Sequence, residues 1–84
     1  MSYELPCLDN RKSFYGKATV REENGEKILK SYWTDVCKID KDWNFVRLWD
    51  GWSATTGRHI NSFRMMNGMD AIPKSKWDKM EVGG

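Results

Sequence analysis

The first half of the chain alternates between apolar and polar residues, which is the pattern of β-strands with one buried face. Over residues 12–22, Phe14, Gly16, Ala18 and Val20 fall on one face, and Tyr15, Lys17, Thr19 and Arg21 fall on the other. The pair Asn24–Gly25 follows, and both residue types tolerate the positive φ of a tight hairpin turn. The pattern therefore predicts a first strand over residues 12–22 and a hairpin turn after it.

Residues 27–39 predict one long second strand. Ile28, Tyr32, Thr34 and Val36 favour one face, whereas Leu29, Trp33, Cys37 and Ile39 favour the other. Because the apolar face changes midway, we expect a bend or a β-bulge within this strand. Residues 40–42 predict a second turn, and Trp43 beside it occupies a position where a small residue is expected. Residues 44–49 predict a third strand.

Helical spacing replaces alternation after this strand. Ser53 is suited to cap the N-terminus of a helix over residues 54–66, because its hydroxyl can accept a backbone N–H. The side chains of Thr56, Ile60, Phe63 and Met66 recur at helical spacing and should face the sheet. Asn67–Gly68 is a typical helix stop. Residues 75–80 predict a short helical turn that returns Trp77 and Met80 to the core.

These elements predict one small α+β domain. Its fold is a three-stranded antiparallel β-meander followed by one α-helix on one sheet face, with a short C-terminal turn or helix. We expect an irregular arm over residues 1–11, the β-β-β-α core over residues 12–67, and a tail over residues 68–84 that packs back through Trp77. The residues expected to point toward the helix are Phe14, Ala18, Val20, Val46 and Leu48.

Composition narrows the classes of function. The 84 residues include 14 basic and 12 acidic side chains, and the two signs are interspersed along the chain. Proteins that follow a phosphate backbone usually cluster their bases, so the net charge of +2 gives little support to non-specific nucleic-acid binding. No apolar stretch approaches membrane-spanning length, and the N-terminal residues lack the features of a signal peptide. We therefore expect a cytoplasmic protein in which Cys7 and Cys37 are free thiols.

The sequence offers little for catalysis or metal binding. Its one histidine, His59, is expected at the helix–sheet boundary, hydrogen-bonded to strand backbone. The alternative, a general base acting on Cys37 or Ser53, has no support from the spacing. Zinc would need closely paired ligands, and Cys7, Cys37 and His59 lie far apart. We therefore expect no enzyme activity, no catalytic residue, no metal and no cofactor.

Two surfaces are candidates for binding. The outer sheet face combines aromatic and basic residues, which are types that dominate binding energy at interfaces. Its candidate residues are Tyr15, Lys17, Arg21, Lys30, Tyr32, Arg47 and Trp49. The alternative for this face is a solvated surface with cross-strand pairs. The helix start is a candidate anion-binding corner, formed by Ser53, Thr55, Thr56, Arg58 and His59, whose alternative role is capping alone.

Three segments resemble a known family. They are residues 30–36 (KSYWTDV), 47–56 (RLWDGWSATT) and 58–63 (RHINSF), and the Ser-Ala-Thr-Thr-x-Arg-His-Ile segment is the most specific part. The chain is similar, over roughly residues 12–64, to an uncharacterised family of short proteins from phages and mobile elements of Gram-positive, often gut-dwelling, bacteria. That resemblance carries no catalytic or binding residue. It implies a genetic context in which small proteins often regulate, or inhibit host defence.

The leading functional hypothesis is a non-enzymatic protein-binding module that acts as an inhibitor or accessory factor, for example against host nucleic-acid-targeting defence machinery. The alternative is a small nucleic-acid-binding regulatory domain that uses the exposed sheet face. Acidic residues near that face, such as Glu22 and Asp35, weigh against the alternative. An exposed edge beside the long second strand would also allow two chains to pair as a homodimer. No membrane partner is expected.

Overall fold

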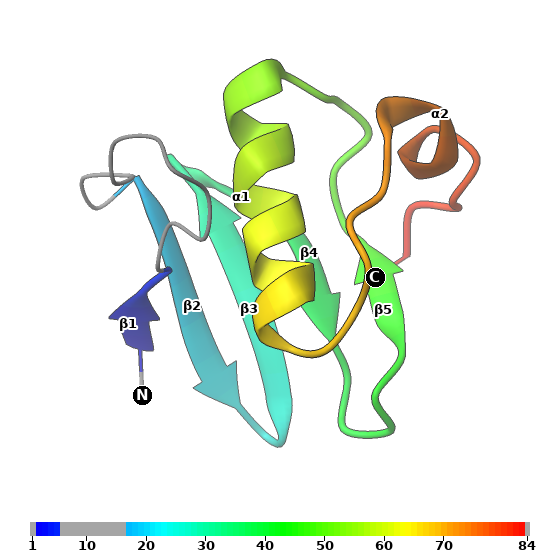
Figure 1. Ribbon diagram of the computed structural model, residues 1–84. Helices are drawn as coiled ribbons and strands as arrows, with labels where there is room; N and C mark the ends of the chain where they lie inside the picture. The colour runs from blue at the N-terminus through cyan, green and yellow to red at the C-terminus, as the bar shows by residue number, and fades with distance from the viewer. Residues whose placement is uncertain (1, 6–16, 84) are drawn as a thin grey trace.

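A computed structural model describes residues 2–5 and 17–83. In this part of the chain, a five-stranded antiparallel sheet carries one long helix on one face (Figure 1). The strands lie in the order of the sequence: β1 (Ser2–Glu4), β2 (Ala18–Glu23), β3 (Glu26–Ser31), β4 (Thr34–Ile39) and β5 (Phe45–Arg47). The helices are α1 (Ala54–Met66) and α2 (Lys74–Trp77). The α+β class and the antiparallel meander are confirmed, but the prediction of three strands is wrong.

The predicted second strand is in fact two strands. β3 and β4 pair as a hairpin, with Ser31 opposite Thr34 and a two-residue turn of Tyr32 and Trp33 between them. Tyr32 adopts a φ of 55°, in the left-handed region that turns favour and aromatic side chains rarely occupy. The ladder also shifts register between Leu29 and Lys30, which explains the change of apolar face in the sequence.

The N-terminal arm is partly a strand. β1 pairs with β2 and places Tyr3 opposite Val20, and the Leu5 N–H continues the ladder by donating to the Ala18 carbonyl at 2.8 Å. The prediction of an irregular arm is therefore wrong for residues 2–4, because a partner distant in sequence supplies their hydrogen bonds. The predictions for residues 6–16, which include Phe14, Tyr15 and Cys7, concern positions outside the described residues. The third strand is shorter than predicted.

α1 begins and ends where the sequence predicts. The Ser53 hydroxyl accepts the Thr56 N–H at 3.1 Å, and Gly68 follows the helix with a φ of 79°. Thr56, Ile60 and Phe63 are buried, and Met66 packs against the core. The helix therefore lies across the middle of the sheet with the predicted stripe facing the strands (Figure 1).

The core fills the layer between α1 and the inner sheet face. Register places Val20, Leu29 and Cys37 side by side on three neighbouring strands, and all three are buried. Trp77 from α2 closes one end of this layer, where its indole N–H donates to the Gly51 carbonyl at 2.7 Å. The buried apolar residues are Leu5, Ala18, Val20, Leu29, Val36, Cys37, Ile39, Ile60, Phe63, Ile72 and Trp77.

β5 presents the opposite face from the one predicted. Arg47 lies opposite the buried Cys37, so its side chain points inward, whereas Val46 lies opposite Lys38 on the outer face. Val46 and Leu48 are therefore not core residues. The alternation in this strand was predicted, but the choice of face depends on contacts with a distant segment. The Arg47 guanidinium donates to the carbonyls of Trp49, Trp77 and Met80 at 2.8, 3.0 and 2.9 Å.

Candidate functional site

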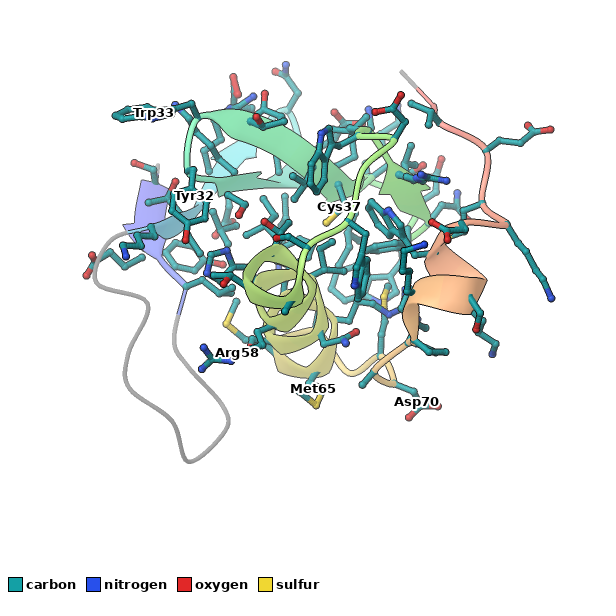
Figure 2. All side chains as sticks on the ribbon, turned by 90° about the horizontal axis from the view of Figure 1, so that it is seen from above. Tyr32, Trp33, Cys37, Arg58, Met65 and Asp70 are labelled. Atoms are coloured by element: carbon teal, nitrogen blue, oxygen red, sulfur yellow. The ribbon has the colours of Figure 1, made fainter. Side chains whose placement is uncertain are left out.

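The turn between β3 and β4 holds two adjacent aromatic residues in solvent. We call Tyr32 and Trp33 the aromatic turn. Trp33 is 89% exposed and Tyr32 is 45% exposed. In Figure 2, Trp33 projects beyond the turn and away from the molecule, whereas Cys37 from the same hairpin points into the layer between sheet and helix. The turn is anchored, because the Tyr32 N–H donates to the Lys17 carbonyl at 2.7 Å.

Two lysines lie against the aromatic turn. The Lys30 Nζ is 5.9 Å from the centroid of the Trp33 ring, and the Lys17 Nζ is 5.9 Å from the centroid of the Tyr32 ring. Both are cation–π distances. The Tyr32 ring also lies 5.9 Å from the His59 ring, which connects the turn to the buried face of α1. One end of the molecule therefore combines two exposed aromatic rings with two ammonium groups.

The outer sheet face differs from the predicted binding face because ion pairs cross it. Arg21 donates to both carboxylate oxygens of Asp35 at 2.7 and 2.8 Å, and its Nε lies 2.5 Å from Glu23. These hydrogen bonds hold the pKa of Asp35 below its usual range. Lys38 forms a second pair with Glu26 at 3.2 Å. Bases on this face are thus matched by neighbouring acids.

The structure divides the predicted binding face. Arg21 and Lys30 lie on the outer face, and Lys17 and Tyr32 lie at the end of the sheet. Arg47 is wrongly assigned to this face, since it is buried and bonded to three carbonyls. Trp49 is also wrongly assigned, because it follows the end of β5 and packs half-buried against the core. Tyr15 lies outside the described residues.

The predicted anion corner is divided as well. Ser53 caps α1, Thr55 is exposed and Arg58 is half-buried, but Thr56 and His59 are buried among core residues. The Ser31 hydroxyl lies 2.7 Å from His59 Nδ1 and 3.1 Å from the Thr56 hydroxyl. This cluster joins β3 to α1 through side chains. For His59 the sequence predicted a hydrogen bond to strand backbone, and its Nδ1 lies instead beside the Ser31 hydroxyl. The five residues therefore do not form one open corner.

Burial sets the chemistry of His59 and Cys37. Removal from water, together with the positive charges of Arg58 and Lys17, lowers the pKa of His59 to about 4. The imidazole is therefore neutral near pH 7. Burial raises the pKa of the Cys37 thiol, so this free cysteine stays protonated in the core. A protonated, buried thiol is a poor nucleophile.

Within residues 2–5 and 17–83, no group of three or more His, Cys, Asp and Glu side chains could hold a metal ion. Within the same residues, no helix is both long and apolar enough to cross a membrane.

Sequence reasoning missed Trp33 as a surface residue. The sequence pattern predicts that Trp33 lies within a strand, on the same face as Cys37 and Ile39, and does not show which face is buried. The signal that could have corrected this is the change of face near the middle of residues 27–39, which marks a turn as well as a bulge. Trp43 is also exposed, at 52%, and also has a positive φ, 68°.

Fold and surface together define a small α+β domain that buries its histidine and presents an aromatic, basic turn to solvent. Residues 3–79 match the family DUF8033, described as a family of unknown function. Because the match covers most of the chain, this protein belongs to that family. A search of the curated proteins found no match, and neither did a search of the solved structures.

Proposed function

We propose that this protein is a non-enzymatic binding module that attaches to a protein partner through its aromatic turn. The observation that carries the proposal is the exposure of Trp33, at 89%, on a two-residue turn. A tryptophan in that position contributes almost no burial to the fold. Trp and Tyr are, however, the residue types that most often dominate binding energy at protein interfaces.

The backbone of the turn supports this reading. Tyr32 occupies the left-handed region, which costs a residue with a Cβ about 1–2 kcal/mol and which Gly or Asn accept more readily. The chain thus forgoes a more stable turn and keeps two aromatic side chains in solvent. A backbone outlier of this kind is a reason to propose that the side chains of the turn serve a function.

The ion pairs of the outer face weigh against the alternative of a nucleic-acid-binding sheet. A sheet that lies in a DNA groove needs bases that can reach phosphates. Here Arg21 is held by Asp35 and Glu23, and Lys38 is held by Glu26. The outer face would have to break these pairs in order to bind a phosphate backbone.

The biological role we propose follows from the resemblance described above. A small phage or mobile-element protein in the cytoplasm of a Gram-positive bacterium would act as an inhibitor or accessory factor by occupying a surface of a host protein. Such a role needs only that a surface of the partner be occupied. A host defence protein that targets nucleic acid is the partner class we favour.

The test compares two tryptophan variants in affinity capture from a nuclease-treated lysate of a Gram-positive gut bacterium. Trp33→Ala should lose the captured protein, with affinity reduced about thirtyfold or more if Trp33 is a hot spot. Trp43→Asn is the matched control, because Trp43 is also exposed and also has a positive φ. Equal capture by wild type and Trp33→Ala, or capture that disappears with nuclease, would refute the proposal. Circular dichroism verifies that both variants fold.

A further inference from the structure

Among the described residues, the charged groups that lie against the two rings of the aromatic turn are both ammonium groups. Lys17 and Lys30 hold their ammonium groups beside the two rings, each 5.9 Å from a ring centroid. Asp35 is the acid whose charge acts on Lys30, but both of its carboxylate oxygens accept hydrogen bonds from Arg21. Its charge is therefore largely balanced within the sheet. The two ammonium groups therefore set the charge beside the two rings.

The opposite end of the sheet carries both acidic and basic residues. β3 runs from the β2–β3 turn to the aromatic turn, and β4 runs back to the β4–β5 turn (Figure 1). Glu23 and Glu26 flank the β2–β3 turn, and Asp40 and Asp42 lie in the β4–β5 turn. Glu23 and Glu26 are ion-paired with Arg21 and Lys38, and Lys41 lies between Asp40 and Asp42, so acids and bases are mixed at that end. Beside the aromatic turn, by contrast, the two described groups that lie against the rings are both ammonium groups.

We infer that the partner contacted by the aromatic turn presents an acidic protein segment, with an apolar side chain beside its carboxylates. The apolar side chain would lie against Trp33, while the carboxylates would meet Lys17 and Lys30. Charge complementarity carries this inference, since a basic partner would face the ammonium groups of Lys17 and Lys30. The inference rests on the proposed function and adds the chemistry of the partner to it.

The chemistry of the turn favours an acidic protein segment over other anions. A nucleic acid would need a basic track that continues beyond the turn, and the adjoining outer face is neutralised by its ion pairs. Two rings and two ammonium groups instead match the size of a short segment of a few residues. The ammonium groups keep the contact dependent on ionic strength, because both lie near solvent.

The inference is tested by titrating the whole protein with four probes while its five indole N–H signals are followed by NMR. The Trp33 signal is identified by its loss in Trp33→Phe. The probes are a Glu/Leu peptide, the matched Gln/Leu peptide, oligothymidylate and phosphatidylserine vesicles. We expect the Trp33 signal to move with the Glu/Leu peptide, and the Gln/Leu peptide to bind about fivefold or more weakly.

Lysine variants provide the matched control. The double variant Lys17→Gln/Lys30→Gln should weaken binding of the Glu/Leu peptide about fivefold. Lys41 is exposed at the opposite end of the sheet, so Lys41→Gln should leave the binding unchanged. Equal binding of the two peptides would refute the inference that the partner segment is acidic, but it would not refute the proposed protein-binding function. Preference for oligothymidylate or vesicles, or a Trp33 signal that no probe moves, would overturn the inference. The capture experiment with Trp33→Ala then decides the proposed function separately.

Discussion

His59 should make the fold sensitive to mild acid. Its side chain is completely buried between β3 and α1, and the removal of water lowers its pKa from 6.5 to about 4. An unfolded chain exposes this imidazole and restores the ordinary pKa. As pH falls below 6.5, the unfolded state therefore binds a proton that the folded state does not bind.

The sign and size of the effect follow from this difference. Stability is complete above pH 6.5 and is lost progressively as pH falls toward about 4. At about 1.36 kcal/mol per pKa unit, the full loss is about 3 kcal/mol, of which about 2 kcal/mol falls between pH 7 and pH 5. For a domain whose unfolding free energy is roughly 5–10 kcal/mol, this is a large fraction.

Urea denaturation at pH 7, 6 and 5, followed by tryptophan fluorescence, measures the loss. With a slope of about 1 kcal/mol per molar urea, the midpoint should fall by about 2 M between pH 7 and pH 5. The hydrogen bonds from Arg21 lower the pKa of Asp35 in the folded state. The stability that Asp35 contributes is therefore lost only as pH falls below its ordinary pKa of 3.8, which lies outside the range from pH 7 to pH 5. The window above pH 5 therefore reports mainly on the histidine.

His59→Gln is the control, because it keeps a polar group near Ser31 but does not titrate. Its stability at pH 7 should be lower than that of the wild type, since Gln replaces a well-packed ring, but it should change little between pH 7 and pH 5. A wild-type midpoint that stays constant over this range would refute the reasoning. So would an equal decline in the variant, because His59 is the single histidine of the chain.

Two further variants test the packing arguments by urea denaturation. Trp43→Asn should raise stability by about 1 kcal/mol, because Asn accepts the φ of 68° at less cost and the indole is half exposed; a lower midpoint would contradict this. Arg47→Gln should lower stability by about 3 kcal/mol, because it leaves carbonyls of Trp77 and Met80 without their buried donor. A loss below about 1 kcal/mol would show that those carbonyls find other donors.

The helix could be predicted because its signals are local. Ser53 caps the first turn, Ile60 and Phe63 repeat at helical spacing, and Asn67–Gly68 supplies the stop. The β2–β3 hairpin was predictable for the same reason, since Asn24 and Gly25 both adopt the positive φ that their residue types favour. Each of these signals acts over a few residues and does not depend on distant partners.

The features that the sequence did not predict depend on contacts between distant residues, or on residues whose own preference is for another conformation. β1 exists because its three residues pair with β2, which follows a long intervening segment. The face of β5 is set by Arg47, whose carbonyl partners Trp77 and Met80 lie about thirty residues away. The β3–β4 turn was read as strand because Tyr32 and Trp33 are both residues that strands favour.

The candidate site therefore lies where local propensity failed. Natural sequences agree with their folds at most positions, and violations concentrate where a residue serves something other than the fold. Tyr32 is such a violation, because the turn would be better served by Gly or Asn. Its neighbour Trp33 buries almost none of its surface, whereas Trp77 is fully buried in the core.

The contrast between these two tryptophans separates a residue that stabilises the fold from the residue that we propose for recognition. Trp77 stacks 5.0 Å from the Arg47 guanidinium and bonds to the Gly51 carbonyl, so its removal would open the core. Trp33 touches the fold chiefly through the Lys30 ammonium, so its removal should change unfolding by about 0.5 kcal/mol or less. A loss of binding in Trp33→Ala can therefore be assigned to the contact surface itself. The aromatic turn is thus a surface at which the proposed function can be examined without disturbing the fold.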